Sequence, residues 1–352
     1  VYIIKMKINY LNFYKNYSFI RESQKELIRR YHLDKKMKCP IHFCLGQEGF
    51  PALLSDFFKP IDYLFSHHRS HAYYLSKKCS LEKIISEFYG NKFGSNKGLA
   101  GSQELSSDEN NFFTGTMLSG MFATSIGSAY SQKYLGTKGI TATVIGDGGM
   151  EEGIVYEALN IASLFSLPIL FICENNRYSV HTEMSERTKN LNFKKKINAF
   201  NIPYMLVKNQ NVNNLYKTVK FIFNQIRKNK TPYFIEIDTF RECGHVGPEN
   251  DDKEYNYRPN DVKTRGQRDI FKKYFSSLKK KKSINKKLSL IKKKNRNLIN
   301  RYFSSSINKE PITFQESLNL NFIKSFDKKI KTFTKGKNRL IINQVLTTPK
   351  PY

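Results

Sequence analysis

The sequence predicts an α/β fold, a doubly wound and mostly parallel sheet flanked by helices, followed by a helical C-terminal extension. Apolar strand-like runs alternate with amphipathic helical runs between residues 141 and 238. Such alternation is typical of a parallel sheet with helices on both faces. After about residue 260 the pattern becomes helical, basic and poor in strands. We therefore expect an α/β domain over residues 1–260 and a basic helical extension over residues 261–352.

Each element is predicted from a local pattern. Residues 1–35 are expected to form an amphipathic helix, and residues 80–89 a second helix with Ser80 at its N-cap. Closely spaced Gly, Ala and Ser in residues 117–135 suit a helix packed tightly against a neighbour. The remaining elements are expected as strand 141–145, helix 150–165, strand 168–173, an extended pair at 206–207, helix 213–228 and strand 233–238.

Composition limits the classes of protein. The chain has 352 residues, which is enough to bury a full core, and five cysteines without CxxC spacing. An odd number of cysteines in a long chain favours reduced thiols over a disulfide framework. No signal-peptide pattern and no run of about 18 apolar residues is present. These features predict a cytoplasmic protein with no membrane span.

The net charge of +29 raises the question of nucleic-acid binding. Residues 261–300 contain 15 Lys and Arg against two Asp, so they supply 15 − 2 = +13 of this charge. No nucleic-acid motif accompanies the lysine runs, and high Lys and Asn content extends along the whole chain. We interpret the runs as a solvated helical face, with an acidic partner surface or weak polyanion binding as the alternative. Nucleic acid is an unlikely partner on this interpretation.

Two short motifs, Gly146-Asp147-Gly148 and Asn175-Asn176, each follow a predicted strand and are separated by 26 residues. In an open parallel sheet, ligands bind beyond the carboxyl ends of the strands. Mg²⁺ prefers oxygen ligands and commonly shares them with a phosphate group. Asp147 offers a charged oxygen, Asn176 a neutral one and Tyr178 a main-chain carbonyl. The pair of motifs therefore predicts a magnesium and diphosphate site.

The segments 146–153 and 156–160, together with Glu174-Asn175-Asn176-Arg177-Tyr178, resemble the cofactor motif of one enzyme family. This family comprises the alpha subunits of the thiamine diphosphate-dependent decarboxylating component of 2-oxo acid dehydrogenases, of the pyruvate, branched-chain and acetoin types. The resemblance extends over about residues 40–260 through Gly46-Gln47-Glu48, residues 68–71 and Tyr257-Arg258. It implies a thiamine diphosphate-binding fold, with thiamine diphosphate and Mg²⁺ as cofactors.

Carried over by position, the resemblance implies roles for individual residues. Asp147, Asn176 and the Tyr178 carbonyl would be the metal ligands. Arg69 would hold the diphosphate, and Thr116 and Leu118 would meet the aminopyrimidine ring. The cofactor-binding set is His68, Arg69, Thr116, Leu118, Gly146, Asp147, Gly148, Gly149, Asn176, Tyr178 and His245, and the catalytic set is His71 and His245. For both catalytic histidines, the alternative is a structural loop histidine. His67, His68 and His71 could also suggest a transition-metal site, because the i and i+4 positions His67 and His71 would share a helix face. The preceding Phe65-Ser66 and the intervening Arg69 favour a strand-to-loop phosphate site instead.

The chain departs from the family pattern at three positions. His68 stands where the family has a tyrosine, and Glu104 replaces a histidine near the substrate entrance. Val246 occupies the position of a serine that is phosphorylated in mammalian-type relatives, so that control is not expected. The Glu104 exchange leaves open a second reaction, transfer of an aldehyde or ketol unit without a lipoyl acceptor.

The resemblance also implies partners. Single-chain relatives carry a catalytic glutamate on a second sheet domain, and this sequence shows one such domain. A separate beta subunit in an α2β2 heterotetramer is therefore expected to complete the site. A small 2-oxo acid would be the substrate, and a lipoyl acyltransferase would be a further partner. A degenerate, non-catalytic subunit is the remaining alternative, and the intact metal-ligand set argues against it.

Overall fold

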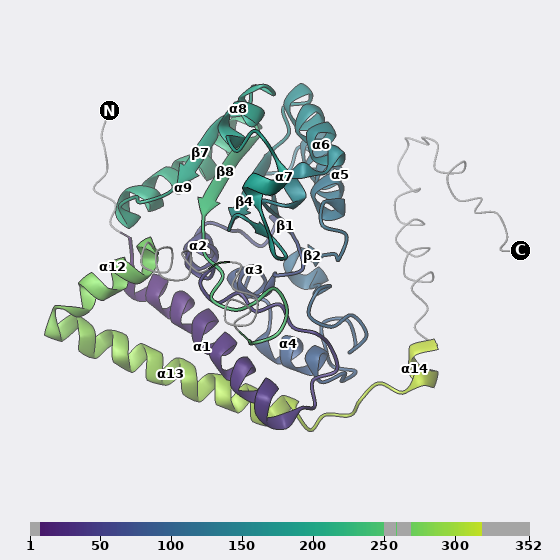
Figure 1. The fold of residues 1–352 in the computed structure, drawn as a ribbon, viewed down its shortest axis with the longest axis vertical. Helices are drawn as coiled ribbons and strands as arrows, with labels where there is room; N and C mark the ends of the chain where they lie inside the picture. The colour runs from purple at the N-terminus through teal and green to yellow at the C-terminus, as the bar shows by residue number, and fades with distance from the viewer. Residues whose placement is uncertain (1–7, 250–257, 259–268, 319–352) are drawn as a thin grey trace, which may run out of the picture. The chain divides into compact units, whose positions relative to one another are not determined.

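The computed structural model describes residues 8–249, 258 and 269–318 (Figure 1). Several sequence predictions lie outside the described residues. They are the first residues of the N-terminal helix, Tyr257 of the family motif, and the end of the C-terminal extension.

Six parallel strands form the main sheet, in the order β2-β1-β3-β4-β8-β7. The strands are β1 (Tyr63–Ser66), β2 (Phe112–Thr114), β3 (Thr141–Gly146), β4 (Ile169–Asn175), β7 (Tyr204–Val207) and β8 (Tyr233–Asp238). A two-stranded antiparallel hairpin, β5 (Tyr178–Ser179) and β6 (Thr182–Glu183), follows β4. The predicted parallel α/β architecture is confirmed, with its central strands at the expected positions.

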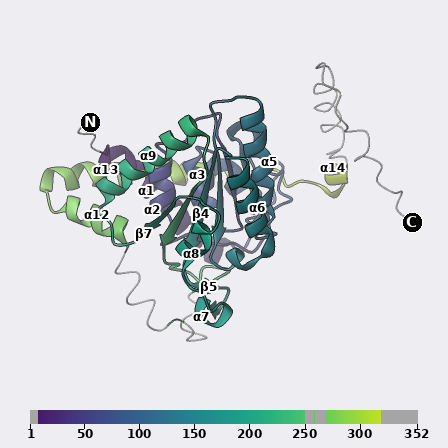
Figure 2. The same ribbon diagram turned by 90° about the horizontal axis from the view of Figure 1, so that it is seen from above.

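Helices cover both faces of this sheet. Figure 2 shows α5 and α6 on one side and α1, α2 and α9 on the other. The helices up to β8 are α1 (Tyr10–Asp34), α2 (Gly49–Leu54), α3 (His71–Ser76), α4 (Leu81–Phe88), α5 (Gly120–Tyr134), α6 (Gly153–Leu164), α7 (Met184–Arg187), α8 (Phe193–Asn198) and α9 (Val212–Asn229).

Alternation along the central strands explains the two layers. On β4, Leu170 and Ile172 belong to the core under α1 and α9, whereas Phe171 and Cys173 belong to the core under α5, α6 and α8. Successive side chains on a strand point to opposite faces, so one continuously apolar strand serves both cores. Every residue of β4 is buried. The sheet is therefore a rigid platform whose carboxyl edge is its polar part.

Helices α12 (Ile270–Lys279) and α13 (Lys282–Ser306) follow residue 260 within the compact unit. Figure 1 shows α13 running beside α1. Phe275 packs against Phe13 with ring centroids 4.9 Å apart, and Asn295 Nδ2 donates to the Lys15 carbonyl at 2.9 Å. The compact unit extends to Pro311 and so includes α12 and α13. Apolar residues at helical spacing on α13 are buried against α1 and α4.

Residues 312–352 form a second unit, of which residues 312–318 are described. It contains α14 (Phe314–Leu318), which begins with a capping box. The Glu316 main-chain N–H donates to the Thr313 hydroxyl at 3.1 Å, and the Thr313 N–H donates to the Glu316 carboxylate at 2.9 Å. Among the described helices of the chain, none is long and apolar enough to cross a membrane.

Some local predictions differ from the structure. Strand β2 and helix α2 carry no periodic pattern strong enough to predict, and their positions follow from tertiary packing. Ser80 does occupy the N-cap of α4, as expected, but its side chain makes no capping hydrogen bond. The glycine-containing loop 90–101 is ordered by the buried Glu87 carboxylate, which accepts from the N–H groups of Asn96, Gly98, Ala100 and Gly101.

Candidate functional site

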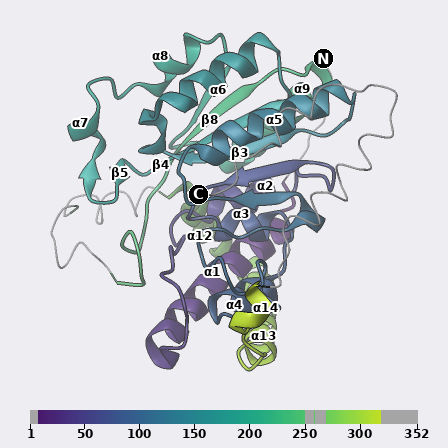
Figure 3. The same cartoon turned by 90° about the vertical axis from the view of Figure 1, so that its right-hand side faces the viewer.

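The carboxyl ends of the parallel strands meet at one edge of the sheet and border a cavity of about 850 Å³, counting the space open to solvent at its mouth. Polar segments follow β1, β2, β3, β4 and β8 at this edge. Figure 3 shows the β5 and α7 segment lying beyond the end of β4. The lining residues are His42, Gln47, His67, His68, Arg69, Gln103, Thr116, Leu118, Gly146, Asp147, Gly148, Gly149, Glu174, Asn176, Tyr178, Ser179, Val180, Arg241 and His245.

Asp147 is the carboxylate among the predicted metal ligands, and 1% of its surface is exposed. Burial raises the pKa of this carboxyl, and the guanidinium of Arg187 counteracts the effect. Arg187 Nη2 lies 2.6 Å from Asp147 Oδ2, and the same guanidinium also pairs with Glu151. The carboxylate is therefore held in an apolar setting by a neighbouring cation, as a buried charge requires.

Asn176 lies beside Asp147 because β3 and β4 pair in register, with Gly146 opposite Glu174. The Asn176 main-chain N–H donates to Asp147 Oδ1 at 3.3 Å. The Asn176 side-chain oxygen accepts from the Tyr178 N–H at 2.9 Å. Hydrogen bonds thus link the three residues predicted as metal ligands, which follow the neighbouring strands β3 and β4 at the cavity wall.

The preceding residue, Asn175, explains why two asparagines occur in succession. Its amide Nδ2 donates to the Glu236 carboxylate of the neighbouring strand β8 at 2.7 Å. Its side-chain oxygen accepts from the Arg177 N–H at 3.0 Å, and Arg177 has a φ of 69°. Asn175 therefore fixes the strand end and the sharp turn, whereas Asn176 lines the cavity.

The glycines at this edge have different roles. At Gly146 an added Cβ would meet no atom within 4 Å, so this position opens onto free space. A Cβ at Gly148 would come within 2.7 Å of Ser179 Oγ, and one at Gly149 within 2.7 Å of Ile145 Cγ1. Gly148 and Gly149 are thus required by close packing of the protein itself, in addition to any ligand.

Two buried arginines supply positive charge to the cavity. Arg69 donates from Nη1 to the Phe43 carbonyl at 2.7 Å and from Nη2 to the His245 carbonyl at 2.9 Å. Burial, and after it the charge of Arg241, lowers the pKa of Arg69 to about 9, so the guanidinium stays charged at neutral pH. Within the described residues no carboxylate forms an ion pair with Arg69. An anion in the cavity would meet this charge.

Arg241 is not among the site residues predicted from the sequence. The structure places it on the cavity wall with 1% of its surface exposed. Arg241 Nε donates to the Cys243 carbonyl at 3.1 Å, and Nη2 donates to the Val180 carbonyl at 3.2 Å. Arg258 Nη1 donates to the Arg241 carbonyl at 3.1 Å. Sequence position alone could not find Arg241, because its contacts come from three separate segments.

Glu174 forms a second acidic position on the wall, directly before the Asn175-Asn176 pair. Gln47 Nε2 and the Tyr73 hydroxyl each donate to its carboxylate at 3.0 Å. His67 Nε2 lies 3.4 Å from Glu174 Oε2. The Gly46-Gln47-Glu48 segment quoted for the family resemblance therefore acts here through Gln47, which orients a buried carboxylate.

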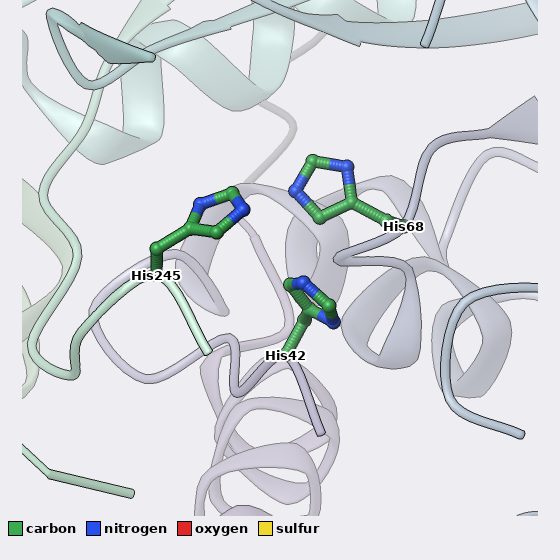
Figure 4. Close-up of side chains that lie close together, drawn as sticks. All are labelled: His42, His68 and His245. Carbon is green, nitrogen blue, oxygen red and sulfur yellow. The ribbon is translucent and has the colours of Figure 1, made fainter. Parts of the chain in front are cut away.

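Three histidines of the cavity wall, His42, His68 and His245, lie close together, as Figure 4 shows. Their ring centroids are 4.8, 5.2 and 5.4 Å apart. Burial, and after it the charge of Arg69, lowers the pKa of His42 to about 2. Burial, followed by the neighbouring His67, also lowers the pKa of His68. Both rings are therefore neutral at physiological pH. His42 was not predicted, since a single histidine in a Pro-rich segment has no distinguishing pattern.

His71 is the predicted site residue that the structure does not bring to the cavity. It is fully buried at the start of α3 and lies 3.1 Å from Gln24 Oε1 and 3.0 Å from Ser102 Oγ. This placement corresponds to the alternative interpretation, a structural histidine. It also separates His71 from His67, which follows β1 in a loop and approaches Glu174, so the two do not share a helix face as a metal pair would.

The free energy of unfolding should fall less on acidification in His71→Gln than in the wild-type chain. The folded pKa of about 3 lies below the ordinary value of 6.5, so between these values the unfolded chain binds a proton that the folded chain excludes. The contribution is complete above about pH 6.5 and falls as pH falls, by about 2 kcal/mol at about pH 5. Urea unfolding at about pH 7.5 and about pH 5 should show wild type losing about 2 kcal/mol more than His71→Gln. The exposed-site variant His32→Gln should behave as wild type, and an equal loss in both variants would contradict this account.

Thr116 and Leu118 both line the cavity, as predicted. The Thr116 hydroxyl donates to Glu104 Oε1 at 2.8 Å. Glu104, which replaces a histidine of the family pattern, is not among the lining residues. Its carboxylate instead holds the Thr116 segment through this hydrogen bond. Apart from His71, every residue of the predicted cofactor and catalytic sets lines the cavity.

Comparisons with known proteins agree with the family resemblance of the sequence motifs. The family model of the dehydrogenase E1 component matches residues 16–313. The pyruvate dehydrogenase E1 component subunit alpha of Rickettsia prowazekii is 30% identical over 241 residues, covering 68% of this chain and 74% of that protein. The testis-specific mitochondrial form from Rattus norvegicus is 31% identical over 236 residues, covering 67% of this chain and 59% of that protein. Transketolase from Leishmania mexicana superposes with a TM-score of 0.52 at 17% identity, covering 83% of this chain and 47% of that chain.

The fold and the cavity define a class: a parallel α/β protein of the thiamine diphosphate-binding fold, with its polar site at the carboxyl edge of the sheet. Within that class, the chain belongs to the dehydrogenase E1 component family. The resemblance to the alpha subunit of the thiamine diphosphate-dependent decarboxylating component of 2-oxo acid dehydrogenases is confirmed.

Proposed function

We propose that this chain binds thiamine diphosphate through Mg²⁺ in the cavity and, with a beta subunit, decarboxylates a small 2-oxo acid. The observation that carries the proposal is the pairing of Asp147 with Asn176 at the ends of neighbouring strands. A carboxylate and an amide oxygen at this position suit Mg²⁺ shared with a phosphate group.

The residues present fit such a group. Asp147 is buried and already meets a cation, so a metal ion would satisfy the same charge. Arg69 and Arg241 line the same cavity and suit a diphosphate anion, since guanidinium groups bind phosphate oxygens in a planar fork. Free space above Gly146 leaves room for a ligand at the strand end. Donor chemistry, charge and space thus agree.

The cofactor, when bound, supplies the electron sink for decarboxylation of a 2-oxo acid. Asp147, Asn176 and the Tyr178 carbonyl would hold the metal. Arg69 and His68 would hold the diphosphate, together with the main-chain N–H groups of Gly148 and Gly149. The Thr116 to Leu118 backbone would orient the aminopyrimidine ring.

His245 is the histidine we propose to face the cofactor and the substrate carboxylate. Arg241 Nη1 lies 3.4 Å from His245 Nδ1, so the guanidinium orients the ring and places positive charge near an incoming carboxylate. Because His71 lies among Gln24 and Ser102, its catalytic role is replaced in this proposal by a positioning role in the fold.

A beta subunit is the proposed partner, in an α2β2 assembly. Support comes from the exposed side of α5 and α6, which we call the α5–α6 face: Gly127, Tyr130, Tyr134, Ile154, Ile161, Leu164 and Phe165. Contiguous exposed apolar side chains of this kind mark interaction surfaces. Among the small residues predicted to pack tightly on a neighbour, Ala129 is buried in this chain's own core, whereas an added Cβ at Gly127 would meet nothing within 4 Å. The neighbour of Gly127 is thus expected to be another chain.

The chain purified alone should show no 2-oxo acid decarboxylation, and activity should appear on co-expression with its beta subunit. Reduction of an artificial electron acceptor by pyruvate and branched-chain 2-oxo acids, with and without Mg²⁺ and thiamine diphosphate, measures this. Activity of the isolated chain would contradict the partner requirement. Carbon–carbon bond formation with an added aldehyde, in place of acceptor reduction, would favour the transferase reaction. Acyl transfer to an added lipoyl domain would support a lipoyl acyltransferase as the further partner.

A further inference from the structure

The cluster of His42, His68 and His245 has a ligand geometry that diphosphate binding does not require. The three residues come from the segment before α2, the segment after β1 and the segment after β8. One ring nitrogen of each lies within 4.8 Å of the other two. Figure 4 shows the rings converging on a common space, with a nitrogen of His68 turned toward a nitrogen of His245.

A second observation points to a ligand at this place. His42 is 2% exposed, and its Nδ1 is buried without a hydrogen-bond partner. A buried polar atom left without a partner in a native structure is a candidate for contact with a bound ligand. Its Nε2 lies 3.4 Å from Gln103 Nε2, a side-chain amide nitrogen that can donate to this ring nitrogen and fix the ring.

We propose that His42, His68 and His245 form a three-imidazole site for a divalent transition-metal ion, of which Zn²⁺ is the best fit. Three histidines with an open fourth position are a recurrent zinc ligand set, and imidazole nitrogen suits this class of metal better than Mg²⁺. The site is separate from the oxygen ligands Asp147 and Asn176, which suit Mg²⁺.

The cavity wall carries Arg69 and Arg241 against Asp147 and Glu174, and Asp147 already pairs with Arg187. The local charge therefore opposes a cation, and the three imidazoles must supply the binding free energy of the ion. Zn–N bonds of about 2.0–2.1 Å in a tetrahedral site require ring nitrogens roughly 3.4 Å apart, so the rings close by about 1 Å. His68 and His245 are half-buried on loops and can rotate toward the fixed His42. Arg241 can release its long 3.4 Å contact with His245 Nδ1, because its bonds to Cys243 and Val180 hold it in place.

The consequence for the enzyme rests on the proposed function. The same histidines border Arg69 and Arg241, where the diphosphate is expected, so an ion on the three rings would compete with cofactor binding. His68 stands where the family pattern has a tyrosine, and a phenol cannot complete the imidazole set. Zinc inhibition that thiamine diphosphate relieves is therefore expected of this chain.

Cobalt(II) tests the site directly, because tetrahedral nitrogen coordination gives intense visible absorption whereas octahedral oxygen coordination gives faint bands. The full-length chain, titrated with Co²⁺ without cofactor, should bind one ion with the tetrahedral spectrum, and Zn²⁺ should displace it. His68→Tyr and His245→Gln should each abolish the spectrum and weaken Zn²⁺ binding by on the order of 100-fold. The matched control His32→Tyr, at an exposed position on α1, should leave both unchanged.

A faint octahedral spectrum, or an intense one that survives His68→Tyr, would overturn the proposal. Using two histidine variants guards against misfolding of either one, and circular dichroism reports their fold. Asp147→Asn should retain the tetrahedral cobalt spectrum, since Asp147 belongs to the oxygen site. Thiamine diphosphate binding is measured separately, with Mg²⁺ and in the complex with the beta subunit. If the cofactor does not bind there but the cobalt spectrum is intact, only the proposed function is contradicted.

Discussion

Asp147→Asn should weaken magnesium-dependent binding of thiamine diphosphate by on the order of 100-fold or more in the complex with the beta subunit. The substitution keeps the shape of the side chain and one oxygen that can accept from the Asn176 N–H. It removes the negative charge that we expect to hold Mg²⁺, and a neutral amide oxygen binds a divalent ion more weakly than a charged carboxylate. Calorimetric titration with and without Mg²⁺ measures the effect, and decarboxylation should fall in parallel.

Asp238→Asn is the matched control. Asp238 is a carboxylate at the end of the neighbouring strand β8, 3.6 Å from Lys208 Nζ, and does not line the cavity. Its substitution changes the net charge equally and should leave cofactor affinity within about twofold, since surface pairs contribute little. Similar losses in both variants would show that general electrostatics, rather than a metal ligand, accounts for the effect. Unchanged magnesium dependence in Asp147→Asn would refute the metal assignment.

Fold stability should survive the Asp147→Asn exchange. Burial already raises the pKa of this carboxyl, which means that the environment disfavours the charge. Arg187 retains Glu151 as a partner when Asp147 becomes neutral. A thermal midpoint close to wild type in the cofactor-free chain would confirm that the binding loss is local. The asparagine therefore separates ligand chemistry from folding better than alanine, which would leave a gap beside Arg187.

The sequence predicted the central sheet well because its information there is local. Strands β3, β4 and β8 are short apolar runs followed at once by polar residues, so each strand and its functional end are adjacent in sequence. Parallel pairing then brings Asp147 and Asn176 to the same edge without further information. The predicted metal pair required only the order of elements and the general rule for parallel sheets.

Residues whose role depends on long-range packing were harder to predict. His42 and Arg241 reach the cavity through segments that carry no periodic pattern, and their importance lies in contacts with His245. His71 was predicted from its match to a family histidine. In the structure α3 begins at His71, and its ring lies beside Gln24 and Ser102. Spacing cannot show which way a side chain points at a loop-to-helix junction.

The basic helices illustrate a different limit. Composition correctly indicated a solvated face, since most lysines of α12 and α13 are exposed. It could not show that the opposite side of α13, with Leu288, Ile299 and Phe303, is part of the main core. A charge excess describes the surface of an amphipathic helix, and the domain to which that helix belongs is determined by its apolar side.

Gly127→Leu should prevent assembly with the beta subunit while leaving the chain itself folded. Gly127 is exposed in the middle of α5, its Cβ direction is open, and leucine is a better helix former by about 1 kcal/mol. Within the chain, the substitution should therefore be neutral or stabilising. In a close helix-to-helix contact, the added side chain would separate the surfaces and remove the packing of Tyr130 and Leu164 nearby. Tightly packed interfaces tolerate such overpacking poorly.

Light scattering of co-expressed chains should show the heterotetramer for wild type and only smaller species for Gly127→Leu, with loss of decarboxylation. Ser276→Leu, which places the same side chain at an exposed position of α12, is the matched control and should assemble normally. Unfolding of the isolated Gly127→Leu chain at or above the wild-type midpoint would exclude misfolding as the cause. Normal assembly of Gly127→Leu would show that the partner surface is not the α5–α6 face, because a leucine at this point prevents a second chain from approaching α5 closely.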